Sequence, residues 1–544
     1  MRHLNDFFSA ETGRRAGCVE RVGEGNPLVT SLEYDSRRVQ PGSLYFALPG
    51  LHTDGHGFIA ETIARGAAVI VHQHQLEQAV ISGASSGGPV FIRVADSRFA
   101  MSPIAAAYYN FPAERLVLAG VTGTEGKSTT VYLIWQLLRL AGKKAGFIST
   151  VQHSSGGDAE WNAEHQTTPE APVIHRCLAE MLNNGAEYAV IEASSHGLSP
   201  RTNRLGDIAF DTAVMTNVTH EHLEFHGTWE QYRDDKANLF RSLDIRAKIN
   251  PNSFGVINAD DKSAPYFAAA TKQKTFTFSA ALGKSGEPDD QSAPLPACAL
   301  PPPDLQLCSI ESGAAGNRYK IYSPNDKTSF YYIEDKLPGA FNAGNVLAAL
   351  LAVSGLLGRP VEELTPLVPA LEPVRGRMTA VNRGQPFEVL VDYAHTPSSF
   401  MTIFPPLRSR IDQKGGRIIS LFGSAGERDT KKRSGQGAIA GRWSDVVILT
   451  DEDPRGEDPM AILEEIAAGV NNGEAADKFR REENLFLIPD RFKAMRKAFS
   501  LAKGGDLVLL LGKGHENSII YSDHTVKYDE IAEAEKALDE LRKH

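Results

Sequence analysis

One stretch of the sequence decides the fold, Leu116-Val-Leu-Ala-Gly120-Val-Thr-Gly123-Thr-Glu-Gly126-Lys127-Ser128-Thr129-Thr130. A short apolar run enters a glycine-rich turn, and the apolar stretch 131–140 that follows has the length of a helix. Its glycines allow backbone N–H groups to close around phosphate oxygens at the N-terminus of that helix. Lys127 would reach the outer phosphates, and the Ser128 hydroxyl would ligate Mg²⁺. The stretch predicts a phosphate-binding loop, although Val121 breaks the strict consensus and kinase, ATPase, transporter and ligase all stay open.

The composition is that of an ordinary folded protein. The chain has 544 residues, of which 42% are hydrophobic and 23% charged, so we expect three or four domains. A net charge of −10 excludes a global positive field that would recruit nucleic acid or anionic membranes. The sequence has no apolar run of roughly 18 residues, no secretory signal and no C-x-x-C pair. We therefore expect a cytoplasmic protein without structural zinc or a disulfide scaffold.

Short apolar runs recur on both sides of residue 373. They fall at 188–191, 212–215, 256–258, 389–391, 417–422, 445–449 and 506–511, with helix-like segments such as 459–470 and 491–501 between some of them. Fully apolar strands alternating with helices predict parallel sheets covered on both faces. The first 110 residues predict a smaller α/β unit with strands at 43–48 and 67–71 and a helix at 58–65. We expect domains at 1–111, 112–373 and 374–544.

Residues 281–317 differ in composition from the rest of the chain. They hold six prolines and many glycine, serine and alanine residues, which predicts an irregular surface loop. The segment lies between strand-like stretches at 274–278 and 319–322, so we interpret it as an insertion in a β-rich edge region.

Acid, histidine and lysine residues follow the phosphate loop. Glu192 ends a predicted strand, where ligands bind in parallel sheets, although a solvated acid at a strand end is the alternative. The cluster His220, His222 and His226 indicates metal or phosphate contact no more strongly than a polar surface, because zinc motifs use other spacings. Lys236 lies in a helix-like stretch, where a lysine is usually solvated. If it is desolvated near metals, its neutral amine would react with carbon dioxide to give a carbamate, an oxygen ligand suited to Mg²⁺.

Four polar loops follow predicted strands in the second half, at 392–397, 423–433, 450–459 and 512–516. Because carboxyl ends of parallel strands meet at one edge of a sheet, these loops predict one binding face. Any single loop would also be explained as a solvated turn. Asn345, near the start of another helix, reads by itself as ordinary capping.

Taken together, these motifs resemble the Mur ligases of bacterial cell-wall synthesis over nearly the whole chain. The matching segments are Asp-Ser-Arg-Arg-Val-x-Pro-Gly-Ser at 35–43, Thr-Gly-Thr-x-Gly-Lys-x-Thr at 122–129, Glu-x-Ser-Ser-His at 192–196, Asp-Tyr-Ala-His-Thr-Pro at 392–397, Arg-Asp-x-x-Lys-Arg at 428–433 and Gly-Lys-Gly-His-Glu at 512–516. The resemblance implies an α/β fold of three domains, with a central P-loop mononucleotide-binding domain and a C-terminal Rossmann-like domain. It also implies an amide ligase that uses ATP and Mg²⁺ and acts as a monomer, without nucleic acid or membrane partners. Its substrates would be UDP-MurNAc-L-Ala-D-Glu and a diamino acid (meso-diaminopimelate, L-lysine or L-ornithine).

The resemblance also implies a role for individual residues. Catalysis would rest on Lys127, Glu192, His222 and Lys236. The UDP-muramoyl peptide would contact Ser36, Thr167, Thr168, Ser194 and Arg204. ATP would contact Gly123, Thr124, Glu125, Gly126, Lys127, Ser128, Thr129, Asn345, Arg377 and Asp392. Glu192 would serve a first Mg²⁺, and His222 and carbamylated Lys236 a second, with the Ser128 hydroxyl as a further Mg²⁺ ligand. The incoming amino acid would contact Arg428, Glu452, Asp453, Pro454, Arg455, Gly512 and Glu516.

Two departures from the family pattern leave questions open. Glu125 stands where the family usually has Asn, which puts an unexplained acid beside the phosphates. Asp453 also replaces Asn, so the amino-acid choice stays open. The fork of Arg455 suits the distal carboxylate of diaminopimelate, whereas Glu452, Asp453 and Glu457 would neutralise Arg455 and favour lysine or ornithine. The rival functions are a sibling ligase, acting on folate or adding a dipeptide, and a non-catalytic homologue that binds the UDP-muramoyl peptide.

Overall fold

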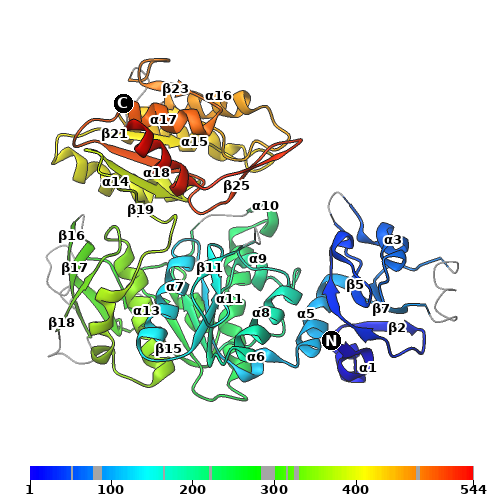
Figure 1. Cartoon of the computed structure of the whole chain (residues 1–544). Helices are drawn as coiled ribbons and strands as arrows, with labels where there is room; N and C mark the ends of the chain where they lie inside the picture. The colour runs from blue at the N-terminus through cyan, green and yellow to red at the C-terminus, as the bar shows by residue number, and fades with distance from the viewer. Residues whose placement is uncertain are drawn as a thin grey trace. The chain divides into compact units, whose positions relative to one another are not determined.

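The chain forms two compact units in a computed structural model. The structure describes residues 1–50, 53–77, 88–162, 166–219, 223–282, 301–313, 316–323, 330–472 and 478–542. Unit 1 consists of Met1–Ser312, Asn317–Lys336 and Ala340–Leu371, and unit 2 of Gly313–Gly316, Leu337–Gly339 and Glu372–His544. Figure 1 colours most of unit 1 from blue to green and most of unit 2 from yellow to red. The domain boundaries expected after residues 111 and 373 stay predictions.

The first sheet of unit 1 has five strands in the order β2-β7-β6-β5-β4. The strands β4 (Ser31–Glu33), β5 (Ser43–Phe46), β6 (Val69–His72) and β7 (Val90–Val94) are parallel, and β2 (Cys18–Val22) is antiparallel to β7. The helices here are α1 (Leu4–Phe7), α2 (Ala10–Arg15), α3 (Ile59–Ala64) and α5 (Ser97–Tyr108), and β1 (Arg2–His3) pairs with β3 (Leu28–Val29). Since β5 and β6 are buried along their whole length, the strands predicted there are confirmed. The predicted helix begins at Ile59, after a 3₁₀ turn over Gly55–Phe58.

A left-handed turn ends α5 and leads to the second sheet. Asn110 and Phe111 have φ angles of 61° and 49°, and the backbone N–H of Phe111 donates to the carbonyl of Ala106 at 2.7 Å. Pro112 then begins α6 (Pro112–Arg115), where its missing N–H costs no helical hydrogen bond. The chain therefore turns sharply between α5 and α6.

The second sheet of unit 1 has eleven strands in the order β11-β10-β9-β12-β8-β13-β14-β15-β16-β17-β18. Its parallel strands are β9 (Ala145–Ile148), β12 (Tyr188–Glu192), β8 (Val117–Thr122), β13 (Thr212–Met215), β14 (Phe254–Asn258), β15 (Lys274–Ser279) and β16 (Leu305–Gly313). Antiparallel pairs close the edges, with β10 (Gln152–Ser154) and β11 (Glu160–Trp161) at one and β17 (Gly316–Tyr322) and β18 (Phe330–Asp335) at the other. Because β8 lies between β12 and β13, polar residues that follow these neighbours lie beside the loop that follows β8.

Helices cover both faces of this sheet, as its apolar strands predict. They are α7 (Lys127–Leu140), α8 (Ala171–Asn183), α9 (Ser195–Leu198), α10 (Leu223–His226), α11 (Trp229–Arg246), α12 (Ala264–Ala269) and α13 (Asn342–Leu357). Side chains of α8 and α11 form one core with alternate strand residues, and α7 packs against α13. No single helix in the described ranges is long and apolar enough to cross a membrane, although α13 and Val361–Ala370 pass that test as a pair bent by 106°.

Unit 2 contains a six-stranded sheet in the order β19-β20-β24-β21-β22-β23. The strands β20 (Glu388–Asp392), β24 (Leu507–Leu511), β21 (Ile418–Phe422), β22 (Val446–Leu449) and β23 (Leu485–Leu487) are parallel, and β19 (Thr379–Ala380) is antiparallel to β20. The helices are α14 (Pro397–Asp412), α15 (Lys431–Trp443), α16 (Pro459–Val470), α17 (Arg491–Leu501) and α18 (Glu530–Leu541), and β25 (Ser518–Ile520) pairs with β26 (Thr525–Lys527). Two cores, one on each face, contain alternate residues of β24, so the parallel sheet predicted here is confirmed.

The interpretation of residues 281–317 as one irregular loop is wrong in its last third. Residues 305–313 form β16, which pairs in parallel with β15. Leu305 and Leu307 are buried at alternate positions, the pattern of a strand with one face on a core. The prolines at 301–303 precede the strand and do not interrupt it. Residues 283–300 lie outside the described residues.

Candidate active site

The phosphate loop connects β8 to α7 in a conformation that requires glycine. At Gly123, φ is +154° and an added Cβ would lie 1.9 Å from the Thr216 hydroxyl oxygen. The backbone N–H of Thr124 donates to the carbonyl of Asn217 at 2.8 Å, and that of Glu125 donates to the Asn217 side-chain oxygen at 2.9 Å. Asn217 follows β13, so the neighbouring strand holds the loop in place.

Lys127 and Asn345 lie on the helices next to this loop. Lys127 is the first residue of α7, and its Nζ donates to the carbonyl of Thr124 at 2.8 Å. The side-chain oxygen of Asn345 accepts from the Thr130 hydroxyl at 3.2 Å. The reading of Asn345 as ordinary capping is wrong, because α13 is capped by Phe341 without a side-chain hydrogen bond. Asn345 instead joins α13 to the first turns of α7.

Ser128 and Glu192 form a buried pair beside the loop. The Ser128 hydroxyl donates to Oε1 of Glu192 at 3.0 Å, and the backbone N–H of Thr150 donates to Oε2 at 2.8 Å. Glu192 is only 2% exposed, so the alternative of a solvated acid at the strand end is wrong. A hydroxyl and a carboxylate are oxygen donors of the kind that Mg²⁺ prefers, and the pair therefore fits that ion.

Lys236 is buried against the phosphate loop. It lies on α11 with 1% of its surface exposed, and its Nζ donates to the carbonyl of Gly123 at 2.5 Å. The same Nζ lies 4.5 Å from the ring centre of Tyr232, whose hydroxyl is 3.0 Å from that of Thr124. Lys236 is therefore not the solvated lysine that its helix would suggest. His220 and His222 lie outside the described residues.

A second polar group surrounds Thr168 next to Glu192. The Thr168 hydroxyl donates to the backbone carbonyl of Glu192 at 2.8 Å and accepts from the backbone N–H of Ser194 at 3.0 Å. Arg204 donates to the carbonyl of Thr168 at 2.8 Å and to Glu170 at 2.9 Å, and Glu170 also accepts from Arg98 at 2.9 Å. The structure therefore brings three predicted substrate residues together.

The other two predicted substrate residues of unit 1 differ in position. Thr167 is half-buried and adjoins Thr168 in the chain. Ser36 is remote from both in sequence and begins the 3₁₀ turn Ser36–Arg38 that follows β4 in the first sheet. The Asp35 carboxylate caps that turn by accepting from the backbone N–H of Arg37 at 3.0 Å.

In unit 2, Asp392 is the last residue of β20. Its two oxygens accept from the backbone N–H groups of Met378 and Ala394, each at 2.7 Å. Burial raises the pKa of Asp392, and the positive charge of Arg377 acts in the opposite direction. The Arg377 guanidinium lies 4.8 Å from the ring centre of Tyr393, so these predicted ATP contacts form one cluster.

Lys513 joins the ends of β22 and β24. Its side chain is fully buried, and Nζ donates to Asp453 at 2.9 Å and to Glu516 at 2.6 Å. Burial raises the pKa of Glu516, although Lys513 opposes that shift. Oε2 of Glu452 is also buried and has no hydrogen-bond partner. Two of the predicted polar loops thus meet at one edge of the sheet.

Two acids expected to neutralise Arg455 pair elsewhere. Asp453 binds Lys513, and Glu457 binds the buried Arg433 at 2.8 Å. Arg455 itself has a φ of 55°, and its Nε is buried without a hydrogen-bond partner. Asp453 and Glu457 are thus paired with other cations, and the choice between diaminopimelate and lysine or ornithine stays a prediction. Arg428, on the loop after β21, is exposed.

Asp54, His56 and His74 offer ligand atoms within 4.8 Å of one another in the first sheet's loops. Nε2 of His56 accepts from the backbone N–H of Gln73 at 3.1 Å, so the proton must be on Nδ1, which donates to Asp54 at 2.6 Å. A metal bound to Nδ1 would have to displace its proton and break its hydrogen bond to Asp54. The hydrogen bonds of His56 join two loops, and this explains the cluster.

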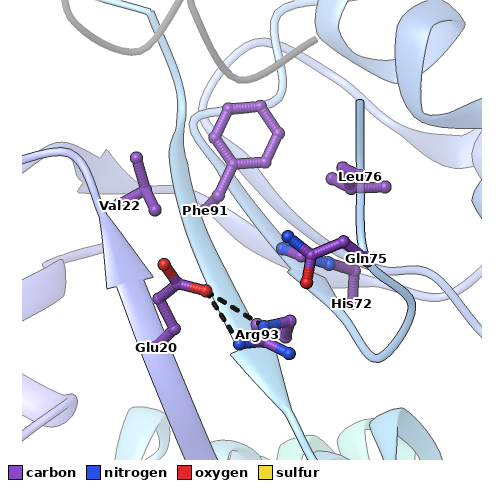
Figure 2. A pocket seen from close by; sticks show the side chains of 7 residues that line it. All are labelled: Glu20, Val22, His72, Gln75, Leu76, Phe91 and Arg93. Carbon is purple, nitrogen blue, oxygen red and sulfur yellow. Dashed lines mark hydrogen bonds and ion pairs between the residues drawn. The ribbon is translucent and has the colours of Figure 1, made fainter. Parts of the chain in front are cut away.

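Figure 2 shows a small pocket between β2, β7 and the end of β6. Glu20 and Arg93 form an ion pair at 3.0 Å within it. Its lining residues are Glu20, Val22, His72, Gln75, Leu76, Phe91 and Arg93. None of these is a predicted site residue, and the only carboxylate and guanidinium in this lining are already paired.

Comparisons with known proteins agree on one family. The Mur ligase middle domain model matches residues 121–353, the glutamate ligase domain model of Mur ligases matches 376–514, and the Mur ligase family catalytic domain model matches 28–108. The UDP-N-acetylmuramyl-tripeptide synthetase of Treponema denticola is 48% identical, with 97% of each chain covered. The chain belongs to the Mur ligase family. A further relative of this Mur ligase is the UDP-N-acetylmuramoyl-L-alanyl-D-glutamate–2,6-diaminopimelate ligase of Geobacillus kaustophilus, which is 37% identical over 95% of the chain and 96% of the relative.

Solved structures of Mur ligases share the three-domain α/β architecture. A UDP-N-acetylmuramoyl-L-alanyl-D-glutamate–2,6-diaminopimelate ligase matches with a TM-score of 0.56 and 26% identity, covering 95% of this chain and 96% of that one. The MurF ligase of Thermotoga maritima, solved in complex with ADP, matches with a TM-score of 0.58 and 18% identity, covering 94% and 99%. The expected fold class is therefore confirmed.

The sequence left some residues of this Mur ligase site without a role. Asn217 holds the phosphate loop, Tyr232 contacts Thr124, and Lys513 binds two of the predicted substrate residues. Position offered the only signal, since Asn217 follows β13 in unit 1 and Lys513 follows β24 in unit 2, each at the carboxyl end of a parallel strand in its own sheet. Tyr232 carries no such signal, because its partner is 108 residues away.

Proposed function

We propose that this Mur ligase joins a diamino acid to the D-Glu of UDP-MurNAc-L-Ala-D-Glu while ATP is converted to ADP and phosphate. Family membership and the names of the similar ligases support this function. One observation about the chain itself carries it: the buried Ser128–Glu192 pair adjoins both the phosphate loop and the Thr168 cluster. A nucleotide and a carboxylate substrate would therefore meet at one place.

The proposed reaction has two steps. The side-chain carboxylate of D-Glu attacks the γ-phosphate of ATP, which releases ADP and leaves an acyl phosphate. The amine of the diamino acid, bound to unit 2, then attacks the acyl carbon, loses a proton and displaces phosphate. Lys127 would stabilise the charge that moves onto the leaving phosphate oxygens, and the loop N–H groups would orient the nucleotide.

We propose two Mg²⁺ ions, the first served by Glu192 and the second by His222 and a carbamylated Lys236, with the Ser128 hydroxyl as a further Mg²⁺ ligand. Bound Mg²⁺ would supply charge neutralisation at the phosphates. Support comes from the buried oxygen donors of Ser128 and Glu192. An unmodified ammonium at Lys236 does not suit a cation site. Its neutral amine would instead attack carbon dioxide, forming an N–C bond and releasing a proton, to give the required oxygen ligand.

The remaining site roles are proposals of the same kind. Ser36, Thr167, Thr168, Ser194 and Arg204 would bind the UDP-muramoyl peptide. Asn345, Arg377 and Asp392 would serve ATP. The amino acid would bind Arg428, Gly512, Glu516 and residues 452–455. We further propose a cytoplasmic monomer that acts in peptidoglycan precursor synthesis, and thereby in cell wall biogenesis, cell shape and division.

A ligation assay tests the proposed function. Purified protein is incubated with ATP, Mg²⁺ and UDP-MurNAc-L-Ala-D-Glu, with meso-diaminopimelate, L-lysine or L-ornithine as acceptor, and phosphate and the tripeptide product are measured. We expect phosphate release only with both co-substrates, and one acceptor that is strongly preferred. A parallel reaction with a folate and L-glutamate serves as control. Product there, with none from the UDP-muramoyl dipeptide, would assign the chain to a sibling function.

A further inference from the structure

A buried chain of hydrogen bonds links Ser195, His226 and Asp235 in unit 1. Nδ1 of His226 lies 2.7 Å from Oδ2 of Asp235, and its Nε2 lies 3.0 Å from the Ser195 hydroxyl. Asp235 and Ser195 are each 1% exposed, and the His226 side chain is fully buried. Gln231 donates to the second oxygen of Asp235 at 3.0 Å. We call these three residues, Ser195, His226 and Asp235, the relay.

The contacts of the relay constrain how its hydrogen bonds are arranged. The carboxylate of Asp235 can only accept, so Nδ1 of His226 carries a proton and donates it. In the neutral imidazole Nε2 then accepts from the Ser195 hydroxyl. The orientation of the ring is thereby set from both ends, and water has no access to loosen it.

Each relay residue is close in sequence to one proposed metal ligand. Ser195 follows Glu192 by three residues, His226 follows His222 by four, and Asp235 immediately precedes Lys236. The three segments come from different elements, namely the turn that begins α9, the end of α10 and the middle of α11. The relay therefore cross-links the stretches of chain that carry Glu192 and Lys236, through a histidine on a third segment.

We propose that the relay is a positioning device that sets the spacing of Glu192 and Lys236, two of the proposed Mg²⁺ ligands. The inference rests on the ligand set of the proposed function. Groups behind metal ligands commonly hold them in the geometry that the metal requires, and their loss lowers metal affinity by about 10- to 100-fold. No relay atom needs to touch substrate for this role. Ser195, buried as it is, acts through the position of Glu192, and Asp235 through that of Lys236.

The test uses two relay variants and one matched control in the full-length protein. Ser195→Ala removes the hydroxyl, and Asp235→Asn replaces an acceptor by an amide that donates to Nδ1 and so reverses the tautomer of His226. Ser444→Ala is the control, because Ser444 is also fully buried and donates one hydroxyl hydrogen bond, to Ser420 at 3.0 Å in unit 2. Mn²⁺ affinity at a fixed saturating ADP concentration is measured by electron paramagnetic resonance, and Tm without metal is measured in parallel.

We expect Ser195→Ala and Asp235→Asn to weaken Mn²⁺ binding by 10-fold or more, with Ser444→Ala within twofold of wild type. The Tm of Ser195→Ala should fall no further than that of Ser444→Ala. A Mn²⁺ affinity of both relay variants within twofold of wild type would overturn the proposal, whatever their Tm. A further variant, Glu192→Gln, distinguishes a failure of the relay proposal from a failure of the proposed ligand set. If it weakens Mn²⁺ binding while the relay variants do not, only the relay fails, and if it has no effect the ligand set itself is wrong.

Discussion

Replacing Lys513 by Met should destabilise unit 2 more than the loss of any exposed ion pair. The side chain of Lys513 is fully buried between Asp453 and Glu516, at 2.9 and 2.6 Å. Without it, Asp453 retains the backbone N–H of Ile520 at 3.0 Å, but the buried carboxylate of Asp453 and the partly buried one of Glu516 lose their counter-ion. Removing one partner from a buried pair costs about 3–5 kcal/mol, and we expect a loss in that range at pH 8.

The loss should shrink in acid. In the variant, the burial of Glu516 is no longer offset by the ammonium, so the folded-state pKa of its carboxyl lies above the unfolded value of about 4. The destabilisation by the uncompensated negative charge is therefore absent below about pH 4, and it grows as the pH rises through the folded-state pKa. Burial already raises the pKa of Glu516 in the wild type, which supports this expectation. We expect a clearly smaller loss at pH 5.5 than at pH 8.

Hydrogen exchange of peptides that cover β24 measures this loss within unit 2. At pH 8 a loss of about 3 kcal/mol corresponds to a roughly 100-fold faster exchange relative to wild type at the same pH. Lys493→Met is the matched control, because Lys493 is 78% exposed and its pair with Asp490 at 3.5 Å should contribute below about 1 kcal/mol. Exchange in Lys513→Met within threefold of wild type at pH 8, or equal losses at both pH values, would refute the reasoning.

Four further outcomes are expected. Lys127→Ala should lower kcat of ligation by at least about 100-fold with an unchanged Tm, since its ammonium acts on phosphate charge; near wild-type turnover would contradict this. Lys236→Ala should abolish ligation, and short carboxylic acids should partly restore it; a high-resolution map of an active, ligand-bound crystal with an unmodified ammonium at Lys236 would refute the modification. Arg455→Ala should raise KM for meso-diaminopimelate far more than for L-lysine, and equal effects would exclude a carboxylate clamp. Burial lowers the pKa of His175 to about 4, so as the pH falls the unfolded chain is protonated before the folded protein. The free energy of unfolding should therefore fall by up to about 3 kcal/mol between pH 6.5 and 4, as measured by denaturant titration. The variant His175→Leu should lack this contribution.

The parallel strands could be predicted because burial on both faces demands continuous apolar runs such as Leu507–Leu511. Strand β16 was missed, because its alternation of buried Leu305 and Leu307 follows a proline-rich segment that dominates the local composition. The phosphate loop could be located from its glycines. The partners that define the chemistry could not, since the bonds of Ser128 to Glu192 and of Lys236 to Gly123 join residues 64 and 113 positions apart. Such pairings depend on strand order, which local patterns do not encode.

The burial of Lys236 affects how the folded enzyme becomes active. The unmodified side chain of Lys236 donates to the carbonyl of Gly123 and so anchors the phosphate loop. If the carbamate is the active form, folding and activation are separate events, with capture of carbon dioxide between them. Protein refolded without bicarbonate should then show a lag before ligation begins, and the lag should shorten as bicarbonate is added. Dissolved carbon dioxide would act as a maturation factor for an enzyme whose reaction does not consume it.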